Sequence, residues 1–167
     1  DLAAFLGYYL AAGSSDCSGR AYTVRLAFEG HCSSLAEDAA ACARAAFGCE
    51  PRISKSGEGV EVVIRSKLIY LLVDALGCGG TAGERTVPDL IFNLERDLIG
   101  NYLGAAFQAG STGTHGRRAR SIRLKAASGD AVRRLIWLAG EIGVQMSYAE
   151  RDTALQRTGT LRKTYIC

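Results

Sequence analysis

The sequence lacks any apolar run long enough to cross a lipid bilayer. A transmembrane helix needs about 20 consecutive apolar residues. The apolar segment at residues 2–12 is much shorter, and no basic stretch precedes it as in a secretory signal. These absences predict an intracellular protein of the cytoplasm or nucleoid that has no membrane partner.

Ligands for a structural zinc ion are also scarce. The chain has only two histidines, His31 and His115, and its six cysteines include no CxxC pair. Zinc sites draw on closely spaced pairs of such residues. We therefore expect no zinc site and reduced thiols, with a single disulfide as the alternative.

The chain is not strongly basic, because its net charge is only +3. Overall charge therefore does not by itself predict nucleic-acid binding. The basic residues are clustered, however, and clustered Arg and Lys are typical of phosphate binding. A solvated basic face is the alternative interpretation. The clusters are Arg117, Arg118, Arg120, Arg123 and Lys125, and Arg157, Arg162 and Lys163.

Two parts of the chain repeat each other. Residues 5–14 read FLGYYLAAGS and residues 102–111 read YLGAAFQAGS, at an offset of 97. Residues 23–26 (TVRL) and 121–124 (SIRL) repeat at an offset of 98. A preserved spacing indicates a duplicated unit. We expect a first unit at residues 1–80, a linker at 81–89 and a second unit at 90–167, together forming one compact pseudo-symmetric domain.

Hydrophobic periodicity predicts the same order of elements in each unit. An apolar helix ends at Gly-Ser, where Gly13 and Gly110 suit a left-handed cap, and a strand, an amphipathic helix and two strands follow. In the first unit the later elements are expected at residues 33–47, 51–55, 60–65 and, as an added helix, 67–76. In the second unit they are expected at residues 130–142, 144–149 and 160–166.

The repeated helix, with its small residues and terminal Gly-Ser, resembles the LAGLIDADG motif of homing endonucleases, in the dodecapeptide, intein-type, single-chain form with two repeats. Residues 83–89 (GERTVPD) resemble the linker before the second motif in intein-borne members. The resemblance implies an α+β fold: a pseudo-twofold duplication of an αββαββ unit, with two saddle-shaped antiparallel sheets flanking a central pair of helices. Gly7 and Gly104 would let these helices approach closely. An unrelated duplicated αβ protein is the alternative.

The chain departs from the family at the residue before the last glycine of each motif. Active members carry an acid there, and both acids bind a divalent metal, Mg²⁺, between the two DNA strands. Here the positions are Ala12 and Ala109, and Asp16 and Gln108 lie near but not at them. A methyl group cannot coordinate Mg²⁺, and without metal nothing lowers the pKa of the attacking water. We do not expect this chain to bind Mg²⁺ without DNA.

The resemblance implies a site-specific double-stranded DNA-binding domain of a homing endonuclease. Active members hydrolyse phosphodiesters; this chain is expected to bind a long target as a monomer without cleaving it. The two alanines have two explanations. One is deliberate inactivation, and the other is a naturally non-catalytic DNA-binding regulator of the WhiA type or an RNA maturase.

The alternation of inward and outward residues along the strands predicts which side chains contact DNA. If Tyr22, Val24, Leu26 and Phe28 face the core, the intervening residues face outward, where Arg and Gln read base edges and Lys holds phosphate. For any one of them, a merely solvated strand residue is the alternative. The proposed set is Thr23, Arg25, Arg52, Ser54, Arg65, Arg123, Lys125, Gln145 and Ser147, with His115, Arg117, Arg118 and Arg120 from a loop.

The family also places a basic residue from a late strand of each half near the metal. The resemblance makes Arg65 or Lys67, and Lys163, the candidates for this auxiliary role. His115 as a metal ligand is an alternative to its phosphate contact.

Overall fold

The computed structural model describes residues 1–29, 32–57, 59–79, 84–110, 124–126, 128–154 and 161–166. For residues 125–126, 150–154 and 161–166 it describes the backbone alone. Within these ranges, no helix has the length and apolar character needed to cross a membrane.

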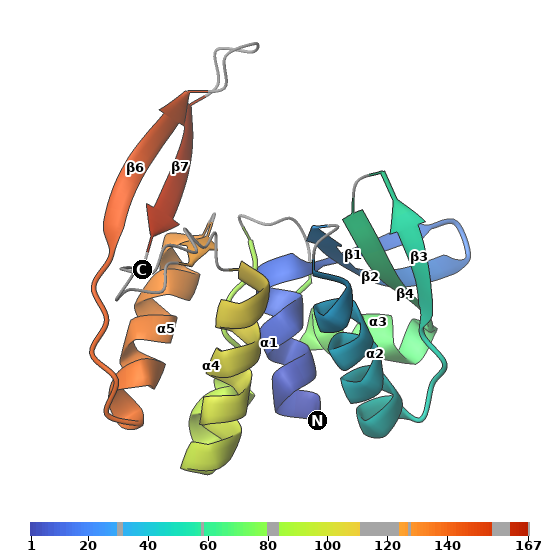
Figure 1. The fold of residues 1–167 in the computed structure, drawn as a ribbon, viewed down its shortest axis with the longest axis horizontal. Helices are drawn as coiled ribbons and strands as arrows, with labels where there is room; N and C mark the ends of the chain where they lie inside the picture. Colours follow the sequence, from blue (N-terminus) through green and yellow to red (C-terminus); the bar gives the residue numbers. More distant parts are fainter. Residues whose placement is uncertain are drawn as a thin grey trace.

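The first unit forms one sheet with helices packed on one of its faces (Figure 1). Strands pair antiparallel in the order β1-β2-β4-β3. Val24, Leu26 and Phe28 of the second strand are buried against the helices, as their alternation predicts. The elements are α1 (Leu2–Ala12), β1 (Gly13–Ser18), β2 (Ala21–Glu29), α2 (Ser33–Phe47), β3 (Arg52–Ser56), β4 (Gly59–Arg65) and α3 (Lys67–Ala75).

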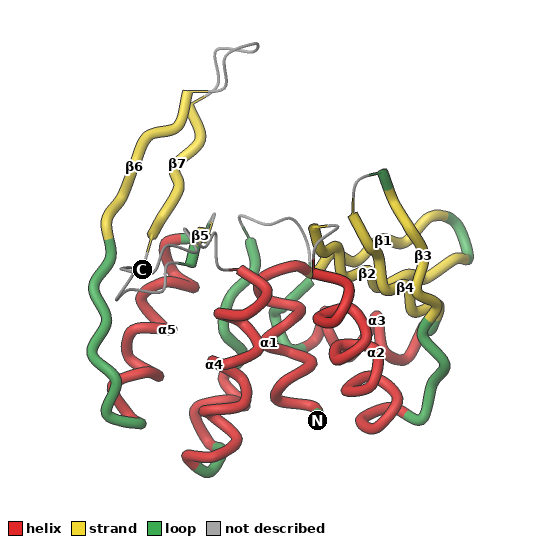
Figure 2. Tube along the Cα trace, in the orientation of Figure 1, coloured by secondary structure: helices red, strands yellow, loops and turns green. Residues whose placement is uncertain are grey.

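In its described residues the second unit also combines helices with an antiparallel sheet, which here has three strands instead of four. Its strands pair antiparallel in the order β5-β7-β6, and its sheet lies on the same side of the helical layer as the first (Figure 2). The elements are η2 (Asp89–Asn93), α4 (Arg96–Gly110), β5 (Lys125–Ala126), α5 (Gly129–Glu141), β6 (Ala149–Ala154) and β7 (Leu161–Ile166). The predicted α+β architecture with a central helix pair, α1 and α4, is confirmed.

The two central helices touch through an asymmetric interface. A Cβ added at Gly7 would lie 2.2 Å from the carbonyl oxygen of Tyr102, so α1 needs glycine there. Across the interface α4 contributes the buried Ala105 and Ala106. A Cβ at Gly104 would meet nothing within 4 Å. The prediction that Gly104 also permits the close approach is therefore wrong, because that position points away from α1.

Gly13 ends α1 in an extended conformation, with φ −79° and ψ 156°. The predicted left-handed cap is wrong at this position, because the chain passes directly from the helix into β1, a strand that alternation does not reveal. Glycine is needed for space instead, since a Cβ would lie 2.4 Å from the Tyr9 carbonyl oxygen. The left-handed glycine cap occurs at the end of α2, where Gly48 has φ 61°.

Strand β6 begins later than predicted. Residues 144–149 were expected to form it, but it spans Ala149–Ala154. The N–H of Val144 donates to the Ala139 carbonyl at 2.9 Å, so this residue closes the end of α5 instead of joining a sheet. Gln145 and Ser147 consequently lie in the exposed connection between α5 and β6, and their predicted place on a DNA-facing strand is wrong.

Candidate nucleic-acid interface

The C-terminal ends of α1 and α4 share one cavity of about 170 Å³. It brings together Ala12 and Ala109, the two positions singled out by the repeat, although they are 97 residues apart in sequence. Both alanines are partly buried, and the space beside their methyl groups is open. The lining is Ala11, Ala12, Ala27, Phe28, Glu29, Cys32, Leu35, Gln108, Ala109 and Gly110.

Polar groups hold the two helix ends in place. The Tyr8 hydroxyl donates to Gln108 Oε1 at 3.4 Å across the helix pair. Arg85, from the linker, donates through Nη1 to the carbonyls of Tyr9 and Leu10 at 3.1 and 2.9 Å. A cation at a helix C-terminus opposes the helix dipole, and α1 has no basic residue in its own last turn. Burial lowers the pKa of Arg85.

The functional analysis of the sequence missed Arg85 as a contributor to this site. Its signal was present, because it lies in the GERTVPD segment that resembles a family linker. Arg85 lies 76 and 75 positions after Tyr9 and Leu10, whose carbonyls it contacts. No local sequence pattern encodes a contact over such a distance along the chain.

The residues at the cavity do not suit a divalent metal. Mg²⁺ requires oxygen ligands, usually carboxylates, whereas the two helix ends offer methyl groups. Gln108 and Glu29 supply the polar lining, and the Gln108 oxygen already accepts the Tyr8 hydroxyl. Among the residues that the structure describes, no group of three His, Cys, Asp or Glu side chains is placed to hold a metal ion.

A second candidate surface is the face of the first sheet that points away from the helices, here called the open face. Strand register brings Arg25, Arg52, Arg65 and Ser54 together on it, as the alternation predicted. Its members are Ser14, Asp16, Ser18, Ala21, Thr23, Arg25, Ala27, Glu29, Arg52, Ser54, Ser56, Gly59, Glu61, Val63 and Arg65.

Thr23 also lies on the open face, but it is buried between its neighbours. Its side chain is only 7% exposed. The register places it between Asp16 of β1 and Arg65 of β4, two longer side chains that flank it. Thr23 therefore faces the open side as predicted, but little of its side chain is left exposed to a ligand.

The sequence of the chain is similar to segments of two archaeal DNA polymerases. No family model matches the chain. It is 34% identical over 104 residues to the DNA polymerase II large subunit of Thermococcus kodakarensis, an alignment covering 62% of the chain and 6% of that protein. It is 28% identical over 162 residues to a DNA polymerase of Thermococcus aggregans, covering 94% of the chain and 8% of that protein. The chain thus spans less than a tenth of the curated relatives it matches.

Solved structures match the fold over nearly the whole chain. Mesophilic variants of the homing endonuclease I-DmoI give a TM-score of 0.63 at 12% identity, covering 98% of this chain and 80% of theirs. An I-DmoI variant solved with its target DNA and Mn gives 0.65 at 12% identity, covering 98% and 83%. Full-length DUF199/WhiA from Thermatoga maritima gives 0.62 at 14% identity, covering 99% and 49%. This chain has the LAGLIDADG fold.

Within the LAGLIDADG fold, the predicted auxiliary bases of the first unit do not reach the helix ends. Arg65 pairs with Thr23, four residues along β2 from the cavity-lining Ala27, which is about 13 Å of strand. Lys67 begins α3 and places its Nζ 5.5 Å from the ring centre of Tyr22. The structure therefore places both away from the cavity, contrary to the expectation.

The remaining predicted contacts belong to the second unit. The backbone of Lys125 lies in β5, and that of Lys163 lies in β7, paired with Asp152. Their roles stay predictions. The other proposed residues lie outside the described residues: His115, Arg117, Arg118, Arg120 and Arg123.

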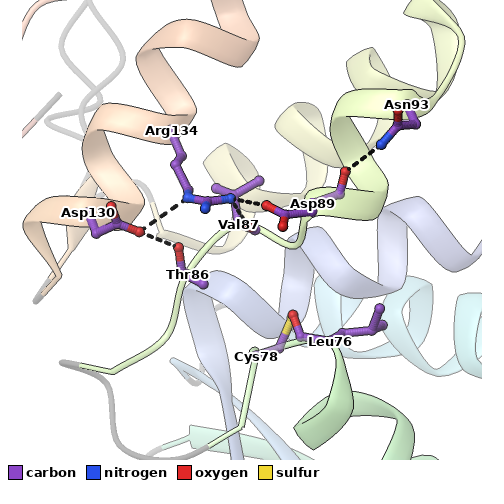
Figure 3. Close-up of polar contacts among 8 residues, drawn as sticks. All are labelled: Leu76, Cys78, Thr86, Val87, Asp89, Asn93, Asp130 and Arg134. Atoms are coloured by element: carbon purple, nitrogen blue, oxygen red, sulfur yellow. Dashed lines mark hydrogen bonds and ion pairs between the residues drawn. The ribbon is translucent and has the colours of Figure 1, made fainter.

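A polar clasp ties the linker to the second unit of the LAGLIDADG fold (Figure 3). Thr86 Oγ1 donates to Asp130 Oδ2 at 2.7 Å. Arg134 of α5 donates to the Val87 carbonyl at 3.1 Å, and it pairs with Asp89 and Asp130. The hydrogen bond to Asp89 raises the pKa of Arg134. The clasp fixes α5 against the segment that leads into α4.

Proposed function

We propose that this chain binds double-stranded DNA at a specific, long site and does not cleave it. One observation carries the proposal: the two central helices end side by side at one cavity, and alanine occupies both positions where a cleaving member would carry an acid. The two sheets, on one side of the helical layer, are the proposed DNA-binding surfaces.

The open face supports the binding half of this proposal. The major groove of B-DNA is about 12 Å wide and admits a two-stranded ribbon. The open face presents Arg25, Arg52 and Arg65 without a side-chain hydrogen bond or ion pair to any described residue. A monomer suffices, since both units belong to one chain. The I-DmoI neighbour was solved in complex with its target DNA.

The chemistry at the cavity supports the proposal that the chain does not cleave DNA. Phosphodiester hydrolysis by an active member needs oxygen ligands for Mg²⁺. Ala12 and Ala109 supply none, and the remaining lining does not replace them. The chain can therefore position DNA across the helix ends without activating water there.

The polymerase alignments suggest where such a domain resides. They cover 6% and 8% of long polymerase chains, while this segment has the fold of homing endonucleases and its linker resembles that of intein-borne members. We infer that the domain belongs to the intein-borne kind, carried within a host polypeptide.

A naturally non-catalytic regulator or maturase is the second candidate. The comparison with DUF199/WhiA favours it, because its TM-score of 0.62 is close to that of the I-DmoI structures. The two candidates differ in whether the cavity still accommodates catalytic acids, which is tested at the end of the Discussion.

The binding experiment uses the whole chain and a pool of duplexes with a long randomised segment. We expect selection to enrich one extended sequence. The logarithm of its binding constant should fall linearly with the logarithm of the salt concentration as counterions are released. Fluorescence anisotropy at several salt concentrations measures this. Undetectable binding to any duplex at low salt would rule out the proposed function.

A further inference from the structure

The linker segment 85–89 is attached to the first unit. Arg85 donates to two carbonyls in the last turn of α1, at 3.1 and 2.9 Å. The backbone that follows Arg85 is held firmly, because Val87 is fully buried in the core and the ring of the buried Pro88 fixes its own φ angle. The segment 85–89 therefore has a fixed position relative to the end of α1.

The same segment is also bonded to the second unit (Figure 3). Thr86 Oγ1 donates to Asp130 at 2.7 Å, and the Val87 carbonyl accepts from Arg134 at 3.1 Å. Both partners lie in the first half of α5. Helix α5 packs in turn against β5 and β7, so a movement of α5 would carry the second sheet with it. The segment 85–89 thus connects the end of α1 to the helix that supports the second sheet.

The central helix pair does not by itself fix the position of the second sheet. Helix α4 packs directly on α1, whereas α5 lies on the far side of α4 (Figure 1). The close contact at Gly7 restrains α4 alone. A pivot of α5 on α4 would therefore move the second sheet relative to the first while the central interface stayed intact, and the bonds to the segment 85–89 oppose this pivot.

The hydrogen-bond lengths set how large a pivot these bonds permit. Successive base pairs are about 3.4 Å apart along a duplex. To fit a site that is one base pair longer, the second sheet would have to move by about that distance. The 2.7 Å bond between Thr86 and Asp130 is lost when it lengthens by about 1 Å. The bonds to α5 therefore break before the sheets reach the spacing of a longer site.

We propose that the segment 85–89 sets the spacing between the two halves of the DNA site, by holding α5 at a fixed position relative to the end of α1. This inference rests on the proposed DNA-binding function. Arg85, Thr86 and Arg134 are positioning residues, because they act through the helices that carry the two sheets. With these bonds intact the chain accepts one spacing, and with them removed it tolerates one base pair more or fewer.

The bonds to α5 can be removed one at a time without unfolding the protein. The side chain of Asp130 is 54% exposed, and polar contacts at exposed sites add little to stability. The buried interface between α1 and α4 is untouched by their loss. Removal of one hydrogen bond nevertheless changes an equilibrium about fivefold, which is enough to measure as a change in preference between two DNA sites.

The test uses the duplex selected from the randomised pool, with one base pair inserted or removed at its centre. Hydroxyl-radical footprinting locates this centre between the two protected segments. Fluorescence anisotropy then gives the ratio of the affinities for the original and the altered spacing. We expect the unmodified chain to prefer the original spacing. In Thr86→Val and in Arg134→Ala this ratio should fall about fivefold for each hydrogen bond lost.

Two control variants separate spacing from stability. Thr86→Ser keeps a hydroxyl donor and should retain the spacing preference of the unmodified chain. Arg133→Ala removes an exposed neighbour on α5, whose 3.9 Å ion pair with Asp130 does not involve the linker, and it should also retain the preference. If Thr86 and Arg134 served stability alone, their loss would weaken binding to all spacings alike and leave the ratio unchanged.

Two results would overturn the inference while leaving DNA binding intact. One is a ratio that stays unchanged in both Thr86→Val and Arg134→Ala. The other is an unmodified chain that binds the original and the altered spacing equally well. Absence of any duplex binding by the unmodified chain would instead remove the proposed function, and the inference with it.

Discussion

Gly7 of α1 packs against the backbone of Tyr102 in α4, so closely that an added Cβ would lie 2.2 Å from the Tyr102 carbonyl oxygen. Because a backbone atom cannot move aside as a side-chain end can, Gly7→Ala must push the two central helices apart. We expect it to lower the free energy of unfolding by about 1–3 kcal/mol, the range for overpacked sites. Urea denaturation measures this.

The repeat supplies a matched control for that substitution. Gly104 occupies the corresponding position in α4, but a Cβ there would meet nothing within 4 Å. Gly104→Ala should therefore be neutral or stabilise the protein by up to about 1 kcal/mol through helix propensity. Equal destabilisation by both substitutions would contradict the asymmetric interface.

Arg85 holds the end of α1 through two carbonyl oxygens. Arg85→Ala removes both hydrogen bonds and a cation from the negative end of the helix dipole. We expect a loss of about 1–3 kcal/mol, and faster amide exchange in the last turn of α1 than in α2. The exposed Arg44 on α2 is the control, and Arg44→Ala should change stability by less than about 0.5 kcal/mol.

The clasp around Arg134 predicts that replacing Arg134 destabilises the protein more than replacing its neighbour Arg133. Arg134 donates to the Val87 carbonyl and lies 5.7 Å from the ring centre of Phe92. Arg133 forms a 3.9 Å ion pair with Asp130. Arg134→Ala should destabilise the protein by about 1 kcal/mol, since exposed ion pairs add little, and Arg133→Ala should have almost no effect.

A spectroscopic signal accompanies the clasp prediction. Trp137, the only tryptophan, has its ring centre 5.2 Å from that of Phe92, the ring beside Arg134. Arg134→Ala should therefore shift the tryptophan emission, whereas Arg133→Ala should not. An unchanged emission spectrum in Arg134→Ala would contradict the clasp.

Burial of the Cys78 thiol predicts a loss of stability in alkali. Burial raises the pKa of Cys78 from 9.0 to about 12. The stabilising contribution of the neutral buried thiol is thus complete below pH 9 and is lost as the pH rises toward 12. The difference in stability between the unmodified chain and Cys78→Ala should shrink across this window. A difference that does not vary with pH would contradict the burial.

The exposed Cys17 should be alkylated at pH 8 well before Cys78.

Periodicity predicted the elements in which burial decides the structure. Helix α2 spans Ser33–Phe47 as expected, and β3, β4 and β7 agree with the predictions to within a residue at each end. In these segments apolar side chains recur with the period of the element, so the sequence itself records which face is covered.

The errors occur where a partner elsewhere in the chain decides the conformation. Strand β1 (GSSDCS) has no apolar alternation, and pairing with β2 holds it in the sheet. Gly104 looks equivalent to Gly7 in the repeat, but the contact depends on how α1 and α4 face each other. The roles of Arg85 and Arg134 likewise rest on contacts between segments 45 to 76 residues apart.

The two positions at the cavity were identified from the sequence, and the structure places them together. The motif sets each alanine before the last glycine of its helix, and the helix pairing then brings both helix ends to one cavity. Their catalytic significance remains a prediction, because it depends on the acids that a cleaving member would carry there.

The most direct test of the account is a cleavage assay on the selected DNA site in Mg²⁺, comparing the chain with substitutions at both helix ends. The unmodified chain should bind the site without cutting it. Ala12→Asp or Ala109→Asp alone should at most nick one strand. If the chain is an inactivated homing endonuclease, the double substitution should cut both strands, because the two carboxylates restore oxygen ligands for Mg²⁺ at the shared cavity. A double variant that binds but never cuts, in Mg²⁺ or Mn²⁺, would favour the natural regulator. Cleavage by the unmodified chain would contradict the central claim outright.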